Sequence, residues 1–188
     1  MPVNEALRKE TDLPISIDTN KSLVAREAMA AGANFINDIS GLTFDKKMAE
    51  VAAETSAGLF LMHTRGRPEV MQRDTEYQSL RDEVCDSLQQ GIEAALVAGI
   101  STEYLAVDPG IGFGKSVVGN LELLHHVGDL HRLGCPILLG TSRKSFIGQI
   151  LHQEDPAERL SGTLATVALG VAQWVQLFRV HDVKAAAE

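Results

Sequence analysis

The chain has 188 residues, of which 45% are hydrophobic and 22% charged, so it is long enough for one domain with a substantial core and too short for two of ordinary size. This composition excludes a disordered chain. The formal net charge of -8 argues against a general nucleic-acid binder, although a local group of cations can still bind an anionic small molecule.

Other features of the sequence narrow the class of protein further. Cys85 and Cys135 lie far apart in the sequence, which suggests neither a zinc site nor a redox pair. The N-terminus lacks the basic and apolar pattern of a signal peptide, and no apolar run approaches the about 18 residues of a membrane span. We therefore expect a cytoplasmic protein with no membrane partner.

Short apolar segments alternate with longer helical patterns along the chain, which predicts a parallel sheet with crossover helices. The predicted strands are residues 15–18, 35–38, 58–63, a strand ending at 108, 136–140 and 175–180. The predicted helices are residues 4–10, 22–31, 46–55, 77–98, 121–133 and a helix within 157–172. The helix at 77–98 is supported by apolar residues that recur at steps of three and four.

The segment from Asp108 to Lys115, Asp-Pro-Gly-Ile-Gly-Phe-Gly-Lys, follows the fourth predicted strand directly. Its alternate glycines let the backbone turn tightly and approach a flat ligand closely. The glycine spacing matches neither a P-loop nor the dinucleotide fingerprint. A purely structural interpretation is also open, in which Asp108 caps the following turn and the glycines form a flexible connection.

Polar side chains fall at or just beyond the carboxyl end of every predicted strand. They are Asp18, Asn37, His63, Asp108, Ser142 to Lys144, and Arg179 with His181. Functional groups on all strand ends are typical of a (β/α)8 barrel, whereas an open doubly wound sheet binds its ligand at one switch point. We therefore predict an α/β fold, an incomplete (β/α)8 TIM barrel with the last six of eight strands, as a single domain over residues 1–188. The first two strands and most of the last helix are then missing.

Six segments, in this order and spanning nearly the whole chain, resemble dihydropteroate synthase. They are ISIDTNK at 15–21, NDI at 37–39, MHTRGRP at 62–68, DPGIGFGK at 108–115, GTSRKSFIG at 140–148 and RVHDVK at 179–184. The resemblance implies condensation of 6-hydroxymethyl-7,8-dihydropterin diphosphate with p-aminobenzoate to dihydropteroate and pyrophosphate in folate synthesis. It also implies Mg²⁺ as a cofactor and a homodimer as one possible assembly.

The family's site residues carry over position by position. The pterin would be held by Asp18, Asn37, Asp108 and Lys144, the diphosphate by Arg179 and His181, and the p-aminobenzoate site would be bordered by Phe113 and Ser142. Because the leaving group gains negative charge, Arg179 and His181 would act on it electrostatically, and no protein nucleophile is required. Lys144, the third expected catalytic residue, would donate to the ring carbonyl or a ring nitrogen of the pterin. The family's magnesium ligand is an Asn of its first strand, so we expect no metal ligand in this chain and little activity from the chain alone.

Structural roles are the alternative for each residue taken singly. Asp18 and Asn37 would then cap the helices that follow, Arg143 and Lys144 would be solvated, and His181 would pair with Asp182. The remaining histidines are expected at the surface: His125, His126, His131 and His152. Gln176 places a polar side chain in a strand that was expected to be buried.

Two other functions stay open. A corrinoid-linked pterin methyltransferase would share the Asp and Asn pterin contacts, although the Ser-Arg-Lys and Arg-Val-His segments argue against it. The chain could instead be an inactive, truncated pterin-binding module.

Overall fold

The structure is a computed structural model that describes residues 2–188. Its strands are β1 (Ser16–Asp18), β2 (Phe35–Asp38), β3 (Gly58–Met62), β4 (Leu105–Asp108), β5 (Leu138–Leu139) and β6 (Leu177–Phe178). Its α-helices are α1 (Pro2–Glu10), α2 (Ser22–Ala30), α3 (Met48–Glu54), α4 (Leu80–Val97), α5 (Val117–His125), α6 (Ser145–Leu151), α7 (Leu160–Ala172) and α8 (Val183–Ala187). Short 3-10 helices cover Met71–Arg73, Thr102–Tyr104, Val127–Leu133 and Pro156–Arg159.

The chain forms two compact units. The first comprises the described residues up to His63 together with Ser87–Val107, and the second comprises Thr64–Asp86 and Asp108–Glu188. Helix α4 therefore contributes its first turns to the second unit and the rest to the first. The single domain expected from the chain length stays a prediction.

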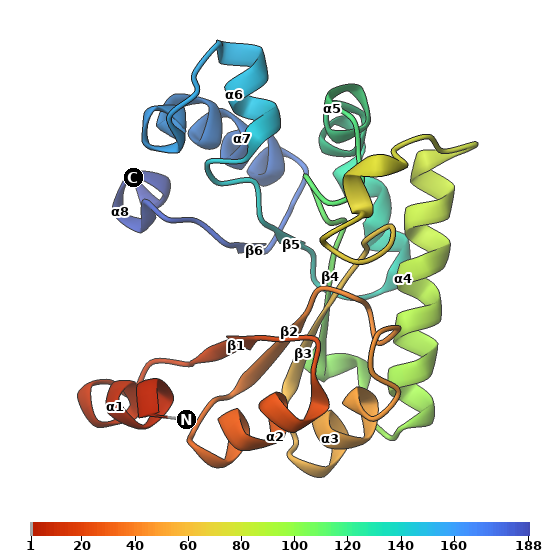
Figure 1. The fold of residues 1–188 in the computed structure, drawn as a ribbon, viewed down its shortest axis with the longest axis vertical. Helices are drawn as coiled ribbons and strands as arrows, with labels where there is room; N and C mark the ends of the chain where they lie inside the picture. Colours follow the sequence, from red (N-terminus) through yellow and green to blue (C-terminus); the bar gives the residue numbers. More distant parts are fainter. Residues whose placement is uncertain (1) are drawn as a thin grey trace. The chain divides into compact units, whose positions relative to one another are not determined.

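The first unit is built on a parallel sheet. Strand β2 pairs with β1 and β3 in parallel, with Ile17 opposite Ile36 and Ile36 opposite Leu59. Helices α2 and α3 contact each other beside these strands (Figure 1) and bury small and apolar side chains such as Ala28 and Met48. Burial of this apolar surface stabilises the unit and leaves the strand ends to carry polar groups.

The second unit contains a short parallel pair and a group of helices. Leu138 of β5 lies opposite Leu177 of β6, and Leu139 lies opposite Phe178. Helices α5, α6 and α7 contact one another (Figure 1). Gly170 of α7 permits a close approach, since a Cβ atom there would lie 2.7 Å from Cε1 of Phe178. The absence of that side chain lets α7 pack directly on β6.

Every predicted strand is present, but several boundaries differ. The described strands form two sheets, one in the order β1-β2-β3-β4 and the other β5-β6. The predicted helix at 121–133 is wrong: α5 begins at Val117, because the Ser116 hydroxyl accepts a hydrogen bond from Gly119 N, and it ends at His125 before a 3-10 helix. Helices α6 and α8 were not predicted.

Gln176 does not lie inside a strand, because β6 begins at Leu177. Its side-chain Oε1 accepts a hydrogen bond of 2.9 Å from the backbone N–H of Ile137, at the residue before β5. The polar side chain thus satisfies a backbone donor at the strand entrance, and its register is no longer in conflict with a buried strand.

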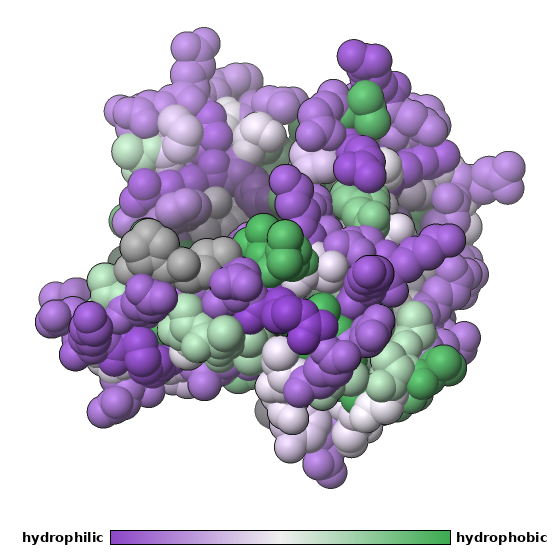
Figure 2. Space-filling view, turned by 60° about the horizontal axis from the view of Figure 1, so that its bottom comes forward, coloured by the Kyte–Doolittle hydropathy of each residue, from purple (hydrophilic) through white to green (hydrophobic). Residues whose placement is uncertain are grey.

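On the face drawn in Figure 2, hydrophilic residues predominate and hydrophobic residues occur among them in small groups. None of the helices within residues 2–188 is long and apolar enough to cross a membrane.

Candidate functional site at the strand ends

Asp18 and Asn37 lie side by side in the first unit, at the carboxyl ends of β1 and β2. They are register partners, and Asn37 Nδ2 donates a 2.9 Å hydrogen bond to Asp18 Oδ2. Asn37 is buried, and its Oδ1 is one of the buried atoms with no hydrogen-bond partner among the described residues. Asp18 is exposed, since β1 is covered less than β2. The pair thus offers one exposed carboxylate and one buried acceptor.

Asp38, the neighbour of Asn37, has a structural role. Its Oδ1 accepts hydrogen bonds from Ser40 N and Ser40 Oγ, and its Oδ2 accepts one from Leu42 N at 2.8 Å. Burial raises the pKa of this carboxyl group, and the Ser40 and Leu42 donors oppose the shift. All of these partners belong to the turn after β2, so Asp38 stabilises the turn.

Asp108 ends β4 and is 1% exposed. Its Oδ1 accepts a 2.7 Å hydrogen bond from Gly110 N, and its Oδ2 lies 3.4 Å from Nη2 of Arg179. Burial raises the pKa of Asp108, while Arg179, the Gly110 N–H, Lys144 and Lys115 all oppose this shift. Asp108 is therefore a buried carboxylate with hydrogen-bond donors and positive charges around it. A ligand N–H group would have to come into direct contact with this carboxylate to donate a hydrogen bond to it.

Phe113 and Lys144 meet across the glycine loop. Lys144 Nζ lies 4.0 Å from the centroid of the Phe113 ring, which is a cation–π contact. A Cβ atom at Gly112 would lie 3.0 Å from Lys144 Cδ, and Gly112 has a φ of +82°. Glycine is therefore required here both for the backbone conformation and for the passage of the lysine.

Ser142 and His181 form a third contact in the second unit. The Ser142 hydroxyl accepts a 3.1 Å hydrogen bond from His181 N and lies 2.9 Å from His181 Nδ1. A Cβ atom at Gly140 would lie 2.8 Å from Arg179 Nη2, so Gly140 leaves room for the guanidinium. The predicted residues of this unit are thus connected in pairs: Asp108 with Arg179, Phe113 with Lys144, and Ser142 with His181.

Arg143 has a structural partner. Its Nε and Nη2 donate to the two carboxylate oxygens of Asp182 at 3.1 and 2.7 Å, which is a bidentate ion pair. Arg143 holds the pKa of Asp182 below its usual value. The alternative in which His181 pairs with Asp182 is replaced by this arrangement, because the aspartate faces Arg143 and the histidine ring faces Ser142.

Residues that support the glycine loop were not singled out from the sequence. Lys115 Nζ donates to Gly110 O and Phe113 O, and Asn120 Oδ1 accepts from Gly112 N at 2.7 Å. Gln72 and Tyr77, from the segment after β3, donate to Gly112 O and Gly114 O. The only sequence signal was the position of Lys115 at the end of the motif.

The other histidines differ in their surroundings. His125, His131 and His152 are exposed as predicted, and His126 is half-buried. His63 is buried directly after β3. Within residues 2–188, no group of three or more His, Cys, Asp or Glu side chains is placed to hold a metal ion.

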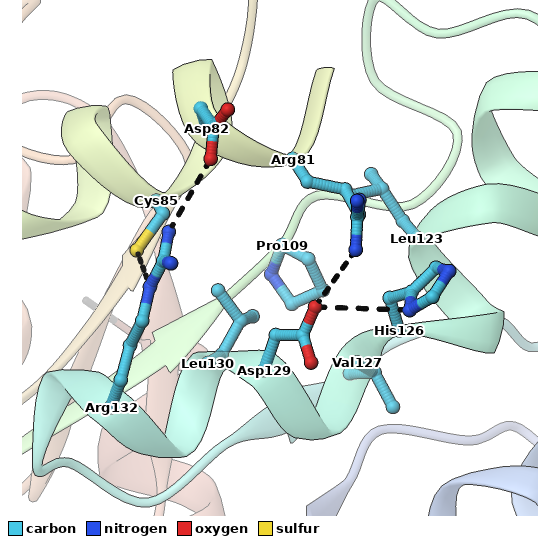
Figure 3. Close-up of a pocket in the computed structure, with 10 residues that line it drawn as sticks. All are labelled: Arg81, Asp82, Cys85, Pro109, Leu123, His126, Val127, Asp129, Leu130 and Arg132. Carbon is cyan, nitrogen blue, oxygen red and sulfur yellow. Dashed lines mark hydrogen bonds and ion pairs between the residues drawn. The ribbon is translucent and has the colours of Figure 1, made fainter. Parts of the chain in front are cut away.

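A separate cavity of about 160 Å³ lies in the second unit (Figure 3). Charged side chains surround it in pairs: Arg81 Nη1 lies 3.1 Å from Asp129 Oδ2, and Arg132 Nε donates to Cys85 Sγ at 2.9 Å. Pro109 is the only residue of the glycine loop that lines it. None of the predicted site residues does.

Comparison with known proteins gives a consistent result. A family model described as "Pterin binding enzyme" matches residues 1–181. A dihydropteroate synthase from Synechocystis is 47% identical over 188 residues, which is 100% of this chain and 65% of that protein. The chain thus spans about 65% of the length of this curated relative.

Two solved structures have the same fold. A Thermus thermophilus dihydropteroate synthase in complex with 6HMPPP superposes with a TM-score of 0.94 at 38% identity, covering 99% of this chain and 73% of that one. A second structure of that enzyme, in complex with 4-aminobenzoate, gives a TM-score of 0.93 at 38% identity, covering 99% and 75%. The predicted fold class is confirmed: the chain is an α/β protein with the strand and helix units of an incomplete (β/α)8 barrel.

Proposed function

The chain belongs to the pterin-binding enzyme family, and we propose that it performs the dihydropteroate synthase reaction, as a whole protein or as part of one. In this reaction 6-hydroxymethyl-7,8-dihydropterin diphosphate and p-aminobenzoate give dihydropteroate and pyrophosphate. The enzyme is a transferase of folate synthesis.

The surroundings of Asp108 carry the proposal. Asp108 is a buried carboxylate, and the cationic side chains of Arg179 and Lys144 act on it. A pterin presents an amino group and ring N–H donors that suit a carboxylate, while a diphosphate needs cations. One group of side chains in the second unit therefore supplies both kinds of partner.

The chemistry assigns a role to each residue. The amine of p-aminobenzoate attacks the exocyclic carbon of the pterin, the bond from that carbon to the diphosphate oxygen breaks with its electron pair on oxygen, and the amine loses a proton. Arg179 and His181 stabilise the negative charge of the leaving pyrophosphate, and Lys144 donates to the ring carbonyl or a ring nitrogen of the pterin, so that these three act as the catalytic residues. The Phe113 ring and Ser142 border p-aminobenzoate.

For the first unit, we propose Asp18 and Asn37 as ligand-binding residues, as the family resemblance implies. The buried Oδ1 of Asn37 has no partner among the described residues, and a buried acceptor of this kind is costly unless a ligand donor satisfies it. Asp18 adds a carboxylate whose Oδ2 already accepts from Asn37.

Mg²⁺ stays a proposal that rests on the family resemblance. No set of this chain's described carboxylates and histidines fits a metal site, so no step is assigned to the ion. We propose only that Mg²⁺ would accompany the diphosphate, whose oxygens are ligands that it prefers. The cytoplasm is the proposed location.

A homodimer is the proposed assembly. Helices α5 and α7 contact each other, and they and the residues after α7 expose large apolar side chains: Val118, Leu169, Val171 and Trp174. Trp174 is 80% exposed. Exposed apolar groups of this kind are typical of interfaces. Light scattering of the parent and of Trp174→Ser tests this, and a monomeric parent would refute it.

The deciding experiment measures product formation and pterin binding separately. The purified protein, in its full length, is supplied with the pterin diphosphate, p-aminobenzoate and Mg²⁺, and dihydropteroate is quantified. Product formation that is lost in Arg179→Met supports the proposal. Pterin binding without product indicates a binding module, and methyl transfer to a corrinoid protein indicates the methyltransferase; either result refutes it.

A further inference from the structure

Lys115 is a buried cation in the second unit and is 3% exposed. Its Nζ donates a 2.9 Å hydrogen bond to Gly110 O and a 2.8 Å hydrogen bond to Phe113 O. The side chain therefore bridges the two ends of the loop segment from inside. Burying an amine costs free energy unless its donors are satisfied, and here two backbone carbonyls satisfy them.

The bridged loop needs such support because of its backbone. Gly110, Gly112 and Gly114 have φ values of +70°, +82° and +63°, and no strand ladder fixes the residues between them. One turn hydrogen bond of 3.0 Å joins Phe113 N to Gly110 O, the same oxygen that accepts from Lys115. A glycine-rich loop loses much conformational entropy when it is ordered. Without Lys115, Gly110 O and Phe113 O would both lose the hydrogen bond from the side chain that joins them.

The loop presents Phe113. The half-buried ring has Lys144 Nζ at 4.0 Å from its centroid. A flat aromatic ligand that packs on Phe113 therefore depends on the loop holding the ring in place. If the loop had to be ordered at the moment of binding, the affinity for that ligand would fall.

We propose that Lys115 is a positioning residue for the aromatic substrate: by bridging Gly110 O and Phe113 O, it holds the Phe113 ring in the conformation that binds p-aminobenzoate. This inference rests on the proposed function. Lys115 touches neither substrate in this role and acts only through Phe113.

The protonation state of Lys115 does not undo the bridge. Burial lowers the pKa of Lys115 to about 7, with Lys144 adding to the shift and Asp108 opposing it. A neutral amine still has two N–H donors, one for each carbonyl. The bridge therefore persists on both sides of neutral pH.

Lys115→Met tests the inference because it keeps the length of the side chain and removes both donors. The KM for p-aminobenzoate should rise about tenfold, because the loop would have to be ordered when this substrate binds. The kcat and the KM for the pterin diphosphate should change less than about threefold. Amide hydrogen exchange at residues 111–114 should become faster. Lys46→Met, an exposed lysine in the first unit, is the matched control and should behave as the parent.

A double-mutant cycle with Phe113→Leu shows whether Lys115 acts through Phe113. The double variant should be no worse for p-aminobenzoate than Phe113→Leu alone, and additive effects would overturn the inference. An unchanged KM for p-aminobenzoate in Lys115→Met, or an equal rise in the KM values of both substrates, would also overturn the inference. If Lys115→Met does not fold, Lys115→Gln, which keeps an amide donor, is measured instead, with a smaller rise expected.

Failure of the proposed function can be distinguished from failure of the inference about Lys115. A parent that forms no dihydropteroate refutes that function, and the inference is then judged on binding and exchange: p-aminobenzoate affinity by calorimetry and exchange at residues 111–114. Unchanged exchange in the Lys115 variant overturns the bridge, and no measurable p-aminobenzoate binding by the parent overturns the inference.

Discussion

Asp108 Oδ2 and Arg179 Nη2 lie 3.4 Å apart, and they join the end of β4 to the residue that follows β6. The carboxylate is buried, whereas the Arg179 side chain is 39% exposed. Arg179 opposes the rise in the pKa of Asp108 that burial causes. Because the Arg179 side chain is partly exposed while its Nη2 stays beside the buried carboxylate, this contact links the proposed pterin and diphosphate partners.

Asp108→Ala should abolish pterin binding. Loss of a buried carboxylate leaves the ligand donors unpaired, at a cost of about 2 to 5 kcal/mol. Calorimetry with the pterin diphosphate measures the change. Cys85→Ala, which alters the cavity of Figure 3 and none of the proposed site residues, is the control and should bind nearly as the parent does. Equal affinities for Asp108→Ala and the parent would remove Asp108 from the site.

Arg179→Met should weaken the binding of inorganic pyrophosphate about 10-fold to 100-fold, because a charge-assisted hydrogen bond is worth about 1.5–3 kcal/mol. Added salt should weaken binding to the parent more than binding to the variant. Arg26→Met is the control, since Arg26 pairs with Glu54 at an exposed position of the first unit. An Arg179 variant that binds pyrophosphate as tightly as the parent would show that the diphosphate lies elsewhere.

Local sequence patterns predicted the strands and the residues at their ends, because apolar runs that stop at polar residues are local signals. The early start of α5 was missed, since it depends on the Ser116 cap, and the break before the following 3-10 helix was missed, since it depends on a non-helical backbone at His126. The support of the glycine loop could not be predicted either. It depends on Asn120 and Tyr77 reaching loop backbone atoms from other segments, and such pairing with backbone donors and acceptors leaves no trace in a sequence pattern.

The pairing of Arg143 with Asp182 could not be predicted from the sequence either. Both residues stand in motifs that resemble those of dihydropteroate synthase, and the sequence offered His181 as the partner of Asp182. The backbone φ of Arg143 is +59°, in the left-handed region, and its side chain forms the bidentate pair with Asp182. A residue pattern does not reveal this left-handed backbone conformation of Arg143. The sequence alone therefore could not show that Asp182 pairs with Arg143 and not with His181.

Asp38→Ala should destabilise the protein by about 2 to 4 kcal/mol, because three hydrogen bonds within the turn after β2 lose their buried acceptor. Denaturant unfolding measures the difference in the free energy of unfolding. Asp12→Ala, at an exposed position, is the matched control and should fall within about 0.5 kcal/mol of the parent. A similar stability for Asp38→Ala would mean that the Ser40 and Leu42 donors find other partners.

Lys115 should make the stability of the protein depend on pH between about 7 and 10. Its pKa is about 7 in the folded protein, whereas an unperturbed lysine of the unfolded chain has a pKa of 10.5. Between these values the unfolded state binds more protons than the folded state, so the free energy of unfolding rises with pH, by at most about 1.4 kcal/mol per pH unit. Below pH 7 both states are protonated, and the cost of burying the charge is present in full.

Lys115→Met should remove this rise. The free energy of unfolding of the parent and of the variant is measured by denaturant unfolding at several pH values from 7.5 to 9.5, and the slope of their difference isolates Lys115 from other groups that titrate there. Asp108 faces Lys115, so the same comparison is repeated in an Asp108→Asn background to remove their coupling. If the parent and the variant have the same slope in both backgrounds, the folded pKa of Lys115 is not lowered, and its ammonium stays charged beside Gly110 O and Phe113 O across this range.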